Sequence, residues 1–513
     1  MSETISNSTR IAKNTVFLYF RMLFLMVISL YTSRVFLASL GISDYGLYNA
    51  VGGFVAMFAI ISAPLTSACT RFLNFEMGTG NTDRLKVVFS TSVTIQLILA
   101  LVIALLCETV GLWFLNYKME IPVGRYYAAN WVFQLSILLF CLNLLTIPYN
   151  AAIVAHERMN VFAYLSIFDG LAKLGICYLI EHEPFDRLVY YAVLLFILQF
   201  IDILLYYLYC RTKFEECKYR FVLDKPLLYN MFDYSLWHLA GNSAAVLNTH
   251  GINILLNLFF GTVVNAAKGV ANQVLTAVRG FANNFMMALN PQITQSYAKK
   301  DFDYMFNLVY KGSRFSFYLM LIPSLPIIIN AEAILSIWLK EVPEHAVFFV
   351  QFSLIAALIS TISNTLITAQ NATGNVRNYQ LIVGGILLLN FPFCYIALKL
   401  GASPESTMVI AVIIEVVALF ARIFMIPLYI KEFNAIDYIK KVVLDCVYVC
   451  VVSTVLPLVL YLLLPDNWVT FTVVTIVAIL TSMIAVFYVG CSISERKMII
   501  SKVISLISGL NSK

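Results

Sequence analysis

The stretch YFRMLFLMVISLYTSRVFLASLG, residues 19–41, decides the fold class because it is apolar for long enough to cross a bilayer. A spanning helix needs about 20 predominantly apolar residues. Two arginines, Arg21 and Arg34, nevertheless lie in this stretch. An arginine at the centre of a spanning helix costs about 2.5–3.5 kcal/mol on an insertion scale, so such residues are rare and usually functional. We therefore expect other parts of the chain to offset that cost.

The composition of the whole chain extends the membrane prediction to all 513 residues. Apolar residues make up 61% of the chain and charged residues only 12%, and the mean hydropathy is +0.84. A soluble domain carries roughly 25% charged residues, so this chain has too little polar surface for a globule in water. The polar start, MSETISNSTR, does not resemble a signal peptide. The fold class predicted is an all-α integral membrane protein.

Fourteen apolar runs of about 20 residues are predicted to span the membrane. They lie at residues 15–37, 45–68, 87–114, 127–151, 160–180, 188–210, 230–259, 264–290, 313–338, 346–369, 379–399, 407–430, 441–463 and 468–490. Alternate loops differ strongly in Lys and Arg content, and the basic-poor side holds only Lys118, Arg125, Arg187, Lys340 and Lys399. The basic side of a membrane protein is the cytoplasmic one. Both termini are therefore predicted in the cytoplasm, and the net charge of +6 needs no nucleic-acid partner.

An internal repeat predicts the domain organisation. GISDYG at residues 41–46 aligns without gaps with GTVVNA at residues 261–266, and the same register pairs Asp83 with Asp303. We expect an N-lobe of six helices at residues 1–210, a cytoplasmic linker at 211–228, a C-lobe of six helices at 229–430, and a terminal helix pair with a tail at 431–513. Such repeats are typical of transporters that rock two bundles around a site near the midplane.

The predicted span 264–290 carries the strongest polar face. At about 100° per residue, Lys268 and Arg279 share one sector with several amides, among them Asn272 and Asn283. Polar residues in membrane bundles often hydrogen-bond between helices, and that is one interpretation. Two cations on one stripe without a neighbouring acid favour the other, a cationic cavity wall. Arg21 shares a polar face with Asn14 and joins this candidate substrate site, whereas Arg34 is expected to have a structural role.

Other intramembrane charges allow two interpretations each. Asp169 and Lys173 have the i, i+4 spacing of a local ion pair, but Asp169 is also a candidate ion-coupling residue, as are His250 and Glu415. Glu415 and Arg422 lie two turns apart, too far for direct contact on ideal helix geometry. Asp202 is expected to be hydrated near a helix end.

The sequence offers no catalytic or cofactor signature. It contains no GxxxxGK[ST] phosphate loop, so ATP is not expected to be used by this chain. The ten cysteines lie mostly in apolar runs, where cysteine acts as a small hydrophobe. We therefore expect a transporter rather than an enzyme, with no metal and no cofactor.

Several motifs resemble one family. SRVFLASLGISDYGLYNAVGG, PYNAAIVAHERMNVFAY, FFGTVVNAAKGVANQV, NPQITQSYAKKD and TAQNATGNVRNYQ occur in that order. The chain is similar to the Wzx-type O-antigen and capsule flippases of the multidrug/oligosaccharidyl-lipid/polysaccharide exporter superfamily. That resemblance implies a bacterial inner-membrane protein that moves undecaprenyl-diphosphate-linked oligosaccharide to the outer leaflet by alternating access, driven by an ion gradient. It also implies membrane lipids as partners, with a polysaccharide polymerase and chain-length machinery as further candidates.

Three alternatives remain open. A lipid II flippase has the same helix count and also uses cavity arginines. A multidrug cation antiporter of the same superfamily would be expected to have acidic cavities and fewer helices. An O-antigen polymerase would be expected to have a large outer loop, which is absent from the predicted topology.

Overall fold

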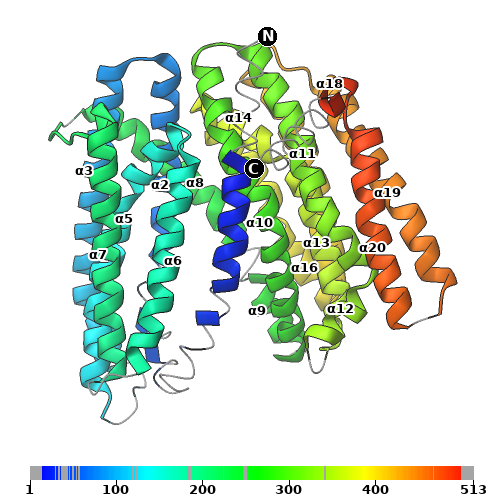
Figure 1. The fold of residues 1–513 in the computed structure, drawn as a ribbon, viewed down its shortest axis with the longest axis horizontal. Helices are drawn as coiled ribbons and strands as arrows, with labels where there is room; N and C mark the ends of the chain where they lie inside the picture. The colour runs from blue at the N-terminus through cyan, green and yellow to red at the C-terminus, as the bar shows by residue number, and fades with distance from the viewer. Residues whose placement is uncertain are drawn as a thin grey trace, which may run out of the picture. The chain divides into compact units, whose positions relative to one another are not determined.

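The computed structural model of the chain is built from helices (Figure 1), and none of the residues it describes lies in a β-strand. The all-α fold class is thus confirmed. The structure describes residues 14–28, 31–32, 35, 44, 47–48, 51–52, 55, 58–117, 121, 124–181, 186–222, 224–246, 251–260, 262–339, 342–465 and 467–497.

The described helices group into two compact units. Unit 1 comprises Met1–Asn242 with Met287–Asp301, and unit 2 comprises Ser243–Met286 with Phe302–Lys513. Helices α8 and α10 therefore each contribute residues to both units. The terminal helix pair groups with unit 2. The division into two repeated six-helix lobes with a separate pair stays a prediction.

Unit 1 is built from long helices that precede the middle of the chain. They are a helix at Asn14–Ile28, then α2 (Ala59–Thr79), α3 (Thr82–Leu106) with a π-helical turn at Cys107–Gly111, α4 (Leu112–Tyr117), α5 (Tyr126–Ala155), α6 (Met159–Glu181), α7 (Arg187–Lys213), a 3₁₀ turn at Glu215–Cys217, and α8 (Lys225–Val246). The packing of unit 1 is centred on α5, which contacts α2, α3 and α7. Buried alanines such as Ala129, Ala151 and Ala152 let neighbouring backbones approach α5 closely, as small residues do in membrane bundles.

Unit 2 has more and shorter helices. They are α9 (Ile252–Phe260), α10 (Thr262–Ala298), α11 (Phe302–Ile329), α12 (Ala331–Trp338), α13 (Ala346–Ile362), α14 (Asn364–Thr373), α15 (Arg377–Leu388), α16 (Asn390–Lys399), α17 (Ser406–Met425), α18 (Ala435–Tyr438), α19 (Leu444–Leu463) and α20 (Trp468–Ala485). Short 3₁₀ and π-helical turns follow α17, α18 and α20 at Ile426–Leu428, Ile439–Val443 and Val486–Gly490. Helices α19 and α20 lie side by side and pack against α11 (Figure 1).

The span that comprises α13 and α14 is bent by 41° at Ser363. Hydrogen bonds from neighbouring helices meet the polar groups at this bend. The Tyr438 hydroxyl donates to the Ile362 carbonyl at 2.7 Å, and an Arg422 guanidinium nitrogen donates to the Ser363 hydroxyl at 3.3 Å. Backbone groups freed by a break inside a bilayer must find such partners.

Among the described residues, nine helices are long and apolar enough to cross a membrane, or ten if α13 and α14 form one span. Helix α10 is not one of the nine although it has 37 residues, because its polar face lowers its hydropathy. The helix at Asn14–Ile28 is apolar but shorter than those nine. The count of fourteen spans therefore stays a prediction.

Candidate functional site: cations on α10 and a carboxyl pair on α6 and α7

The polar face predicted on α10 leaves its side chains accessible in unit 2. Thr276, Arg279 and Asn283 are exposed, and Lys268 and Asn272 are partly exposed. Lipid cannot solvate a charged side chain at membrane depth, so an accessible cation there faces water or protein. This helix face is therefore polar and open rather than closed by packing.

Lys268 has a soft, uncharged neighbour. Its ammonium nitrogen lies 3.2 Å from the Met408 sulfur on α17, and Arg279 is within electrostatic range. Lys268 forms no ion pair with any residue that the structure describes. Its positive charge is left to attract a mobile anion.

Arg279 has one acidic neighbour among the described residues, Glu415, and Glu415 also interacts with Arg422. Glu415 on α17 interacts electrostatically with Arg279 and lies 3.6 Å from the Arg422 guanidinium. The expectation that Glu415 and Arg422 are too far apart was wrong, because their long side chains span the two turns that separate their backbones. Arg422 is buried, so the pair belongs to the packed interior of unit 2, whereas Arg279 is exposed.

An apolar pocket lies on α19 of the same unit. It has a volume of about 580 Å³ and is lined by side chains of α11, α13 and α19, among them Phe317, Leu325, Ile355, Cys450 and Leu458. Nearly all of the lining is hydrocarbon. The pocket suits an alkyl or prenyl chain better than a sugar.

Arg21 belongs to unit 1 and makes an aromatic contact there. Its guanidinium lies 4.3 Å from the centre of the Phe162 ring on α6, and it interacts electrostatically with Tyr206 on α7. The Arg21 Nε atom is buried without a hydrogen-bond partner in the described residues. A cation–π contact offsets part of the cost of placing this charge among apolar helices.

The carboxyl groups of Asp169 and Asp202 meet between α6 and α7. Asp169 binds Lys173 at 2.8 Å, which confirms the predicted i, i+4 pair. Asp202 is only 6% exposed, and its carboxyl group lies within electrostatic range of that of Asp169. The expectation of a hydrated Asp202 was wrong, because its side chain is buried on the side of α7 that faces Asp169 and Lys173 of α6.

Sequence analysis missed Arg71. It lies on α2 with its guanidinium 4.5 Å from the Phe72 ring centre, 5.0 Å from that of Phe75 and 5.9 Å from that of Tyr234. The predicted span 45–68 ended too early, since α2 continues to Thr79. The aromatic residues beside Arg71 in TRFLNFEM were the available signal.

Two predicted positions, Arg34 and His250, lie outside the described residues. Arg21 belongs to unit 1 and the α10 cations to unit 2, so their joint membership of one cavity stays a prediction.

Solved structures with a similar fold are membrane transporters. A MATE transporter in the straight conformation matches with a TM-score of 0.71 at 12% identity, over 83% of this chain and 97% of that one. A MATE transporter from Vibrio cholerae matches with a TM-score of 0.66 at 18% identity, over 85% and 99% of the two chains. A transporter of the same superfamily from Pyrococcus furiosus, reported with a binding pocket of reversed polarity, has a TM-score of 0.64 at 12% identity and covers 82% and 97%.

The fold is therefore that of the multi-pass MATE transporters. The chain belongs to the family described as polysaccharide biosynthesis protein, which matches residues 11–297, and the MatE family matches residues 246–396. None of the curated proteins compared with this sequence matches it. The protein is thus a transporter of the multidrug/oligosaccharidyl-lipid/polysaccharide superfamily and not an enzyme, as the sequence motifs predicted.

Proposed function

We propose that this transporter flips undecaprenyl-diphosphate-linked oligosaccharide units across the bacterial inner membrane. The observation that carries the proposal is the accessible pair of cations on α10, Lys268 and Arg279, neither of which forms an ion pair with a described residue. A diphosphate offers several oxygens to such cations, and hydrogen bonds between charged groups are the strong ones. Asn272 and Asn283 can hydrogen-bond sugar hydroxyls beside them.

The lipid part of the substrate also has a candidate place. The apolar pocket of about 580 Å³ along α19 offers a hydrocarbon surface to a section of the prenyl chain. Together with the α10 face, unit 2 carries both chemistries that a lipid diphosphate presents. The same features suit a lipid II flippase, which carries the same diphosphate on the same kind of lipid.

A multidrug cation antiporter is less well supported. Such a protein needs an acid that is free to attract a cationic drug. In unit 2, Glu415 is held between Arg422 and Arg279, and in unit 1 Asp169 is paired with Lys173. The Pyrococcus neighbour, whose pocket of reversed polarity suggests a different function, is a precedent within the fold for such a difference.

Replacing Arg279 tests the substrate. Arg279→Gln keeps some length and hydrogen-bonding capacity but removes the charge. A hydrogen bond to a charged group contributes about 1.5–3 kcal/mol, so binding of undecaprenyl diphosphate to the purified protein should weaken roughly ten- to more than a hundredfold. Cell-surface glycan should fall while the amount of folded protein in the membrane stays normal.

The matched control is Lys399→Gln, which removes a cation from the exposed end of α16. It should leave binding and surface glycan unchanged. Normal transport by Arg279→Gln, or a defect explained entirely by loss of folded protein, would contradict the proposal. Orientation is tested by labelling single cysteines from outside the cell, which should reach position 403 but not position 300.

A further inference from the structure

The segment that follows α7 is fixed against the start of α3. Phe214 stacks on the His156 ring at 3.9 Å between ring centres, and Glu216 binds His156. Further on, the backbone N–H of Arg220 donates to the Ser90 hydroxyl at 3.3 Å, and the Tyr219 and Thr94 hydroxyls lie 3.3 Å apart. Side chains on this segment are thus held in place relative to α3.

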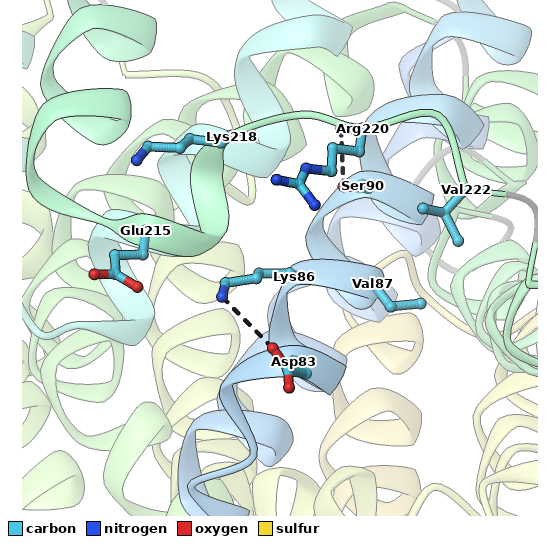
Figure 2. A pocket seen from close by; sticks show the side chains of 8 residues that line it. All are labelled: Asp83, Lys86, Val87, Ser90, Glu215, Lys218, Arg220 and Val222. Carbon is cyan, nitrogen blue, oxygen red and sulfur yellow. Dashed lines mark hydrogen bonds and ion pairs between the residues drawn. The ribbon is translucent and has the colours of Figure 1, made fainter.

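A pocket of about 340 Å³ lies between this segment and α3 (Figure 2). Its lining consists of Asp83, Lys86, Val87, Ser90, Glu215, Lys218, Arg220 and Val222. Liquid water occupies about 30 Å³ per molecule, so the space exceeds what a single phosphate group needs. All of these residues belong to unit 1.

The charges of the lining favour an anion. Three cations, Lys86, Lys218 and Arg220, face two acids (Figure 2). Lys86 lies 3.5 Å from Asp83, but Lys218 and the Arg220 guanidinium form no ion pair with a described residue. The Ser90 hydroxyl accepts from the Arg220 backbone, and its own hydrogen has no acceptor among the described residues. An incoming oxyanion would therefore meet two unpaired cations and a free hydroxyl donor, against one acid, Glu215, that likewise forms no ion pair with a described residue.

The position of the pocket at helix ends points to lipid headgroups as one source of such an anion. Its residues lie at the first turns of α3 and just beyond the last turn of α7, and both helices are candidate membrane spans. Basic residues at the ends of spanning helices are where proteins meet anionic headgroups. We propose that this pocket binds a phosphate-bearing anion, supplied by the headgroup of an anionic phospholipid or by a soluble phosphate. This site is separate from the proposed transport site on α10 and does not depend on it.

The test uses the full-length protein in detergent with two kinds of probe. Native mass spectrometry measures retention of phosphatidylglycerol against phosphatidylcholine, and equilibrium dialysis measures binding of labelled inorganic phosphate. A basic side chain near a headgroup contributes about 1 kcal/mol, so Lys218→Gln and Arg220→Gln should each weaken binding about fivefold. Both side chains are exposed, so folding should be unaffected. The matched control is Lys225→Gln, an exposed lysine on the next helix that does not line the pocket.

Selective retention of phosphatidylglycerol that the pocket variants reduce and Lys225→Gln does not would support the site with a lipid as the source. The same dependence seen with inorganic phosphate alone would support it with a soluble source. Equal binding of both lipids together with no phosphate binding would overturn the proposal. So would equal losses in Lys218→Gln and Lys225→Gln, since they would reflect the overall charge of the surface.

Discussion

The carboxylate of Glu415 decides how the charges of unit 2 are divided. It pairs with the buried Arg422 at 3.6 Å and also feels the exposed Arg279. One arginine is therefore fixed by the fold and the other is available to a ligand. The sequence placed all three residues on membrane helices but could not distinguish these roles, because the reach of long side chains is not visible in helical spacing.

Removing Arg422 should destabilise the protein because it leaves the partner carboxylate, Glu415, without its ion pair. Arg422→Met leaves the Glu415 charge buried with less compensation, and breaking a buried pair from one side costs about 3–5 kcal/mol. The thermal unfolding temperature in detergent should drop clearly. The double variant Arg422→Met with Glu415→Gln removes both charges and should recover part of that loss. If the double variant is as unstable as the sum of the single ones, the two side chains do not act as a pair.

The Glu216 and His156 pair predicts an acid sensitivity outside the membrane. Burial opposes ionisation of Glu216, but hydrogen bonds from His156 and from the Glu216 backbone outweigh it and hold the pKa of this carboxyl below its ordinary value. Because the pKa of Glu216 is lower in the folded than in the unfolded protein, its ionised form stabilises the fold at pH values above the unfolded-state pKa of about 4.3. That stabilisation is lost as the pH falls through the folded-state pKa. Glu216→Gln should therefore unfold at a lower temperature than wild type at pH 7, with the difference shrinking as the pH falls below about 4.3 and vanishing only below the lowered pKa of the folded state. A difference that is constant with pH would exclude this linkage.

At the scale of helices, α2 and the last turns of α10 meet without room for a side chain. A Cβ atom on Gly78 would lie 2.5 Å from the Gln295 carbonyl oxygen and 2.6 Å from the Ala298 Cβ. Both partners are part of a packed helix and cannot give way separately. The close approach therefore depends on glycine at this position.

Gly78→Ala should separate these two helices. Overpacking of this kind typically costs about 1–3 kcal/mol, which would appear as a lower unfolding temperature and less protein in the membrane. Gly175→Ala on α6 is the matched control, because a Cβ there meets nothing within 4 Å. Since alanine favours helix by roughly 0.5–1 kcal/mol, the control should be neutral or slightly more stable. Equal behaviour of the two variants would mean that the contact at Gly78 is not limiting.

The sequence predicted the more apolar helices well. The ranges 127–151 and 188–210 lie inside α5 and α7, and 468–490 covers α20 with its final turn. The prediction from sequence was less accurate where polar residues lie inside a helix, or where a helix continues beyond its apolar stretch. Asp202 is a buried acid inside α7, and the extension of α2 carries Arg71 among aromatic rings. Hydropathy reports transfer into lipid, and it does not register contacts that allow a charged residue to stay inside.

At the scale of the whole molecule, the property to test is the source of energy for transport. The buried carboxyl of Asp202, within electrostatic range of Asp169, is the best candidate place for a coupling proton or cation in unit 1, since Glu415 is already engaged by arginines. We expect transport in vesicles to follow an imposed ion gradient and to survive depletion of ATP. Asp202→Asn should abolish the response to the gradient, while Asp233→Asn, a carboxyl on α8 that accepts from Trp237, should retain it. Transport that follows ATP and ignores gradients would refute the coupling.

The bend between α13 and α14 has a mechanical consequence. An interrupted membrane helix is often regarded as a place where a transporter flexes. Here the carbonyl of Ile362 accepts a hydrogen bond from the Tyr438 hydroxyl, which also lies 2.7 Å from the Ser313 hydroxyl. The hydroxyl of the next residue, Ser363, accepts a hydrogen bond from Arg422. Bending further would break hydrogen bonds from several elements at once, in surroundings with no water to replace them. This break is therefore fixed by hydrogen bonds from two neighbouring helices, and we expect the transporter to flex at positions that lack such partners.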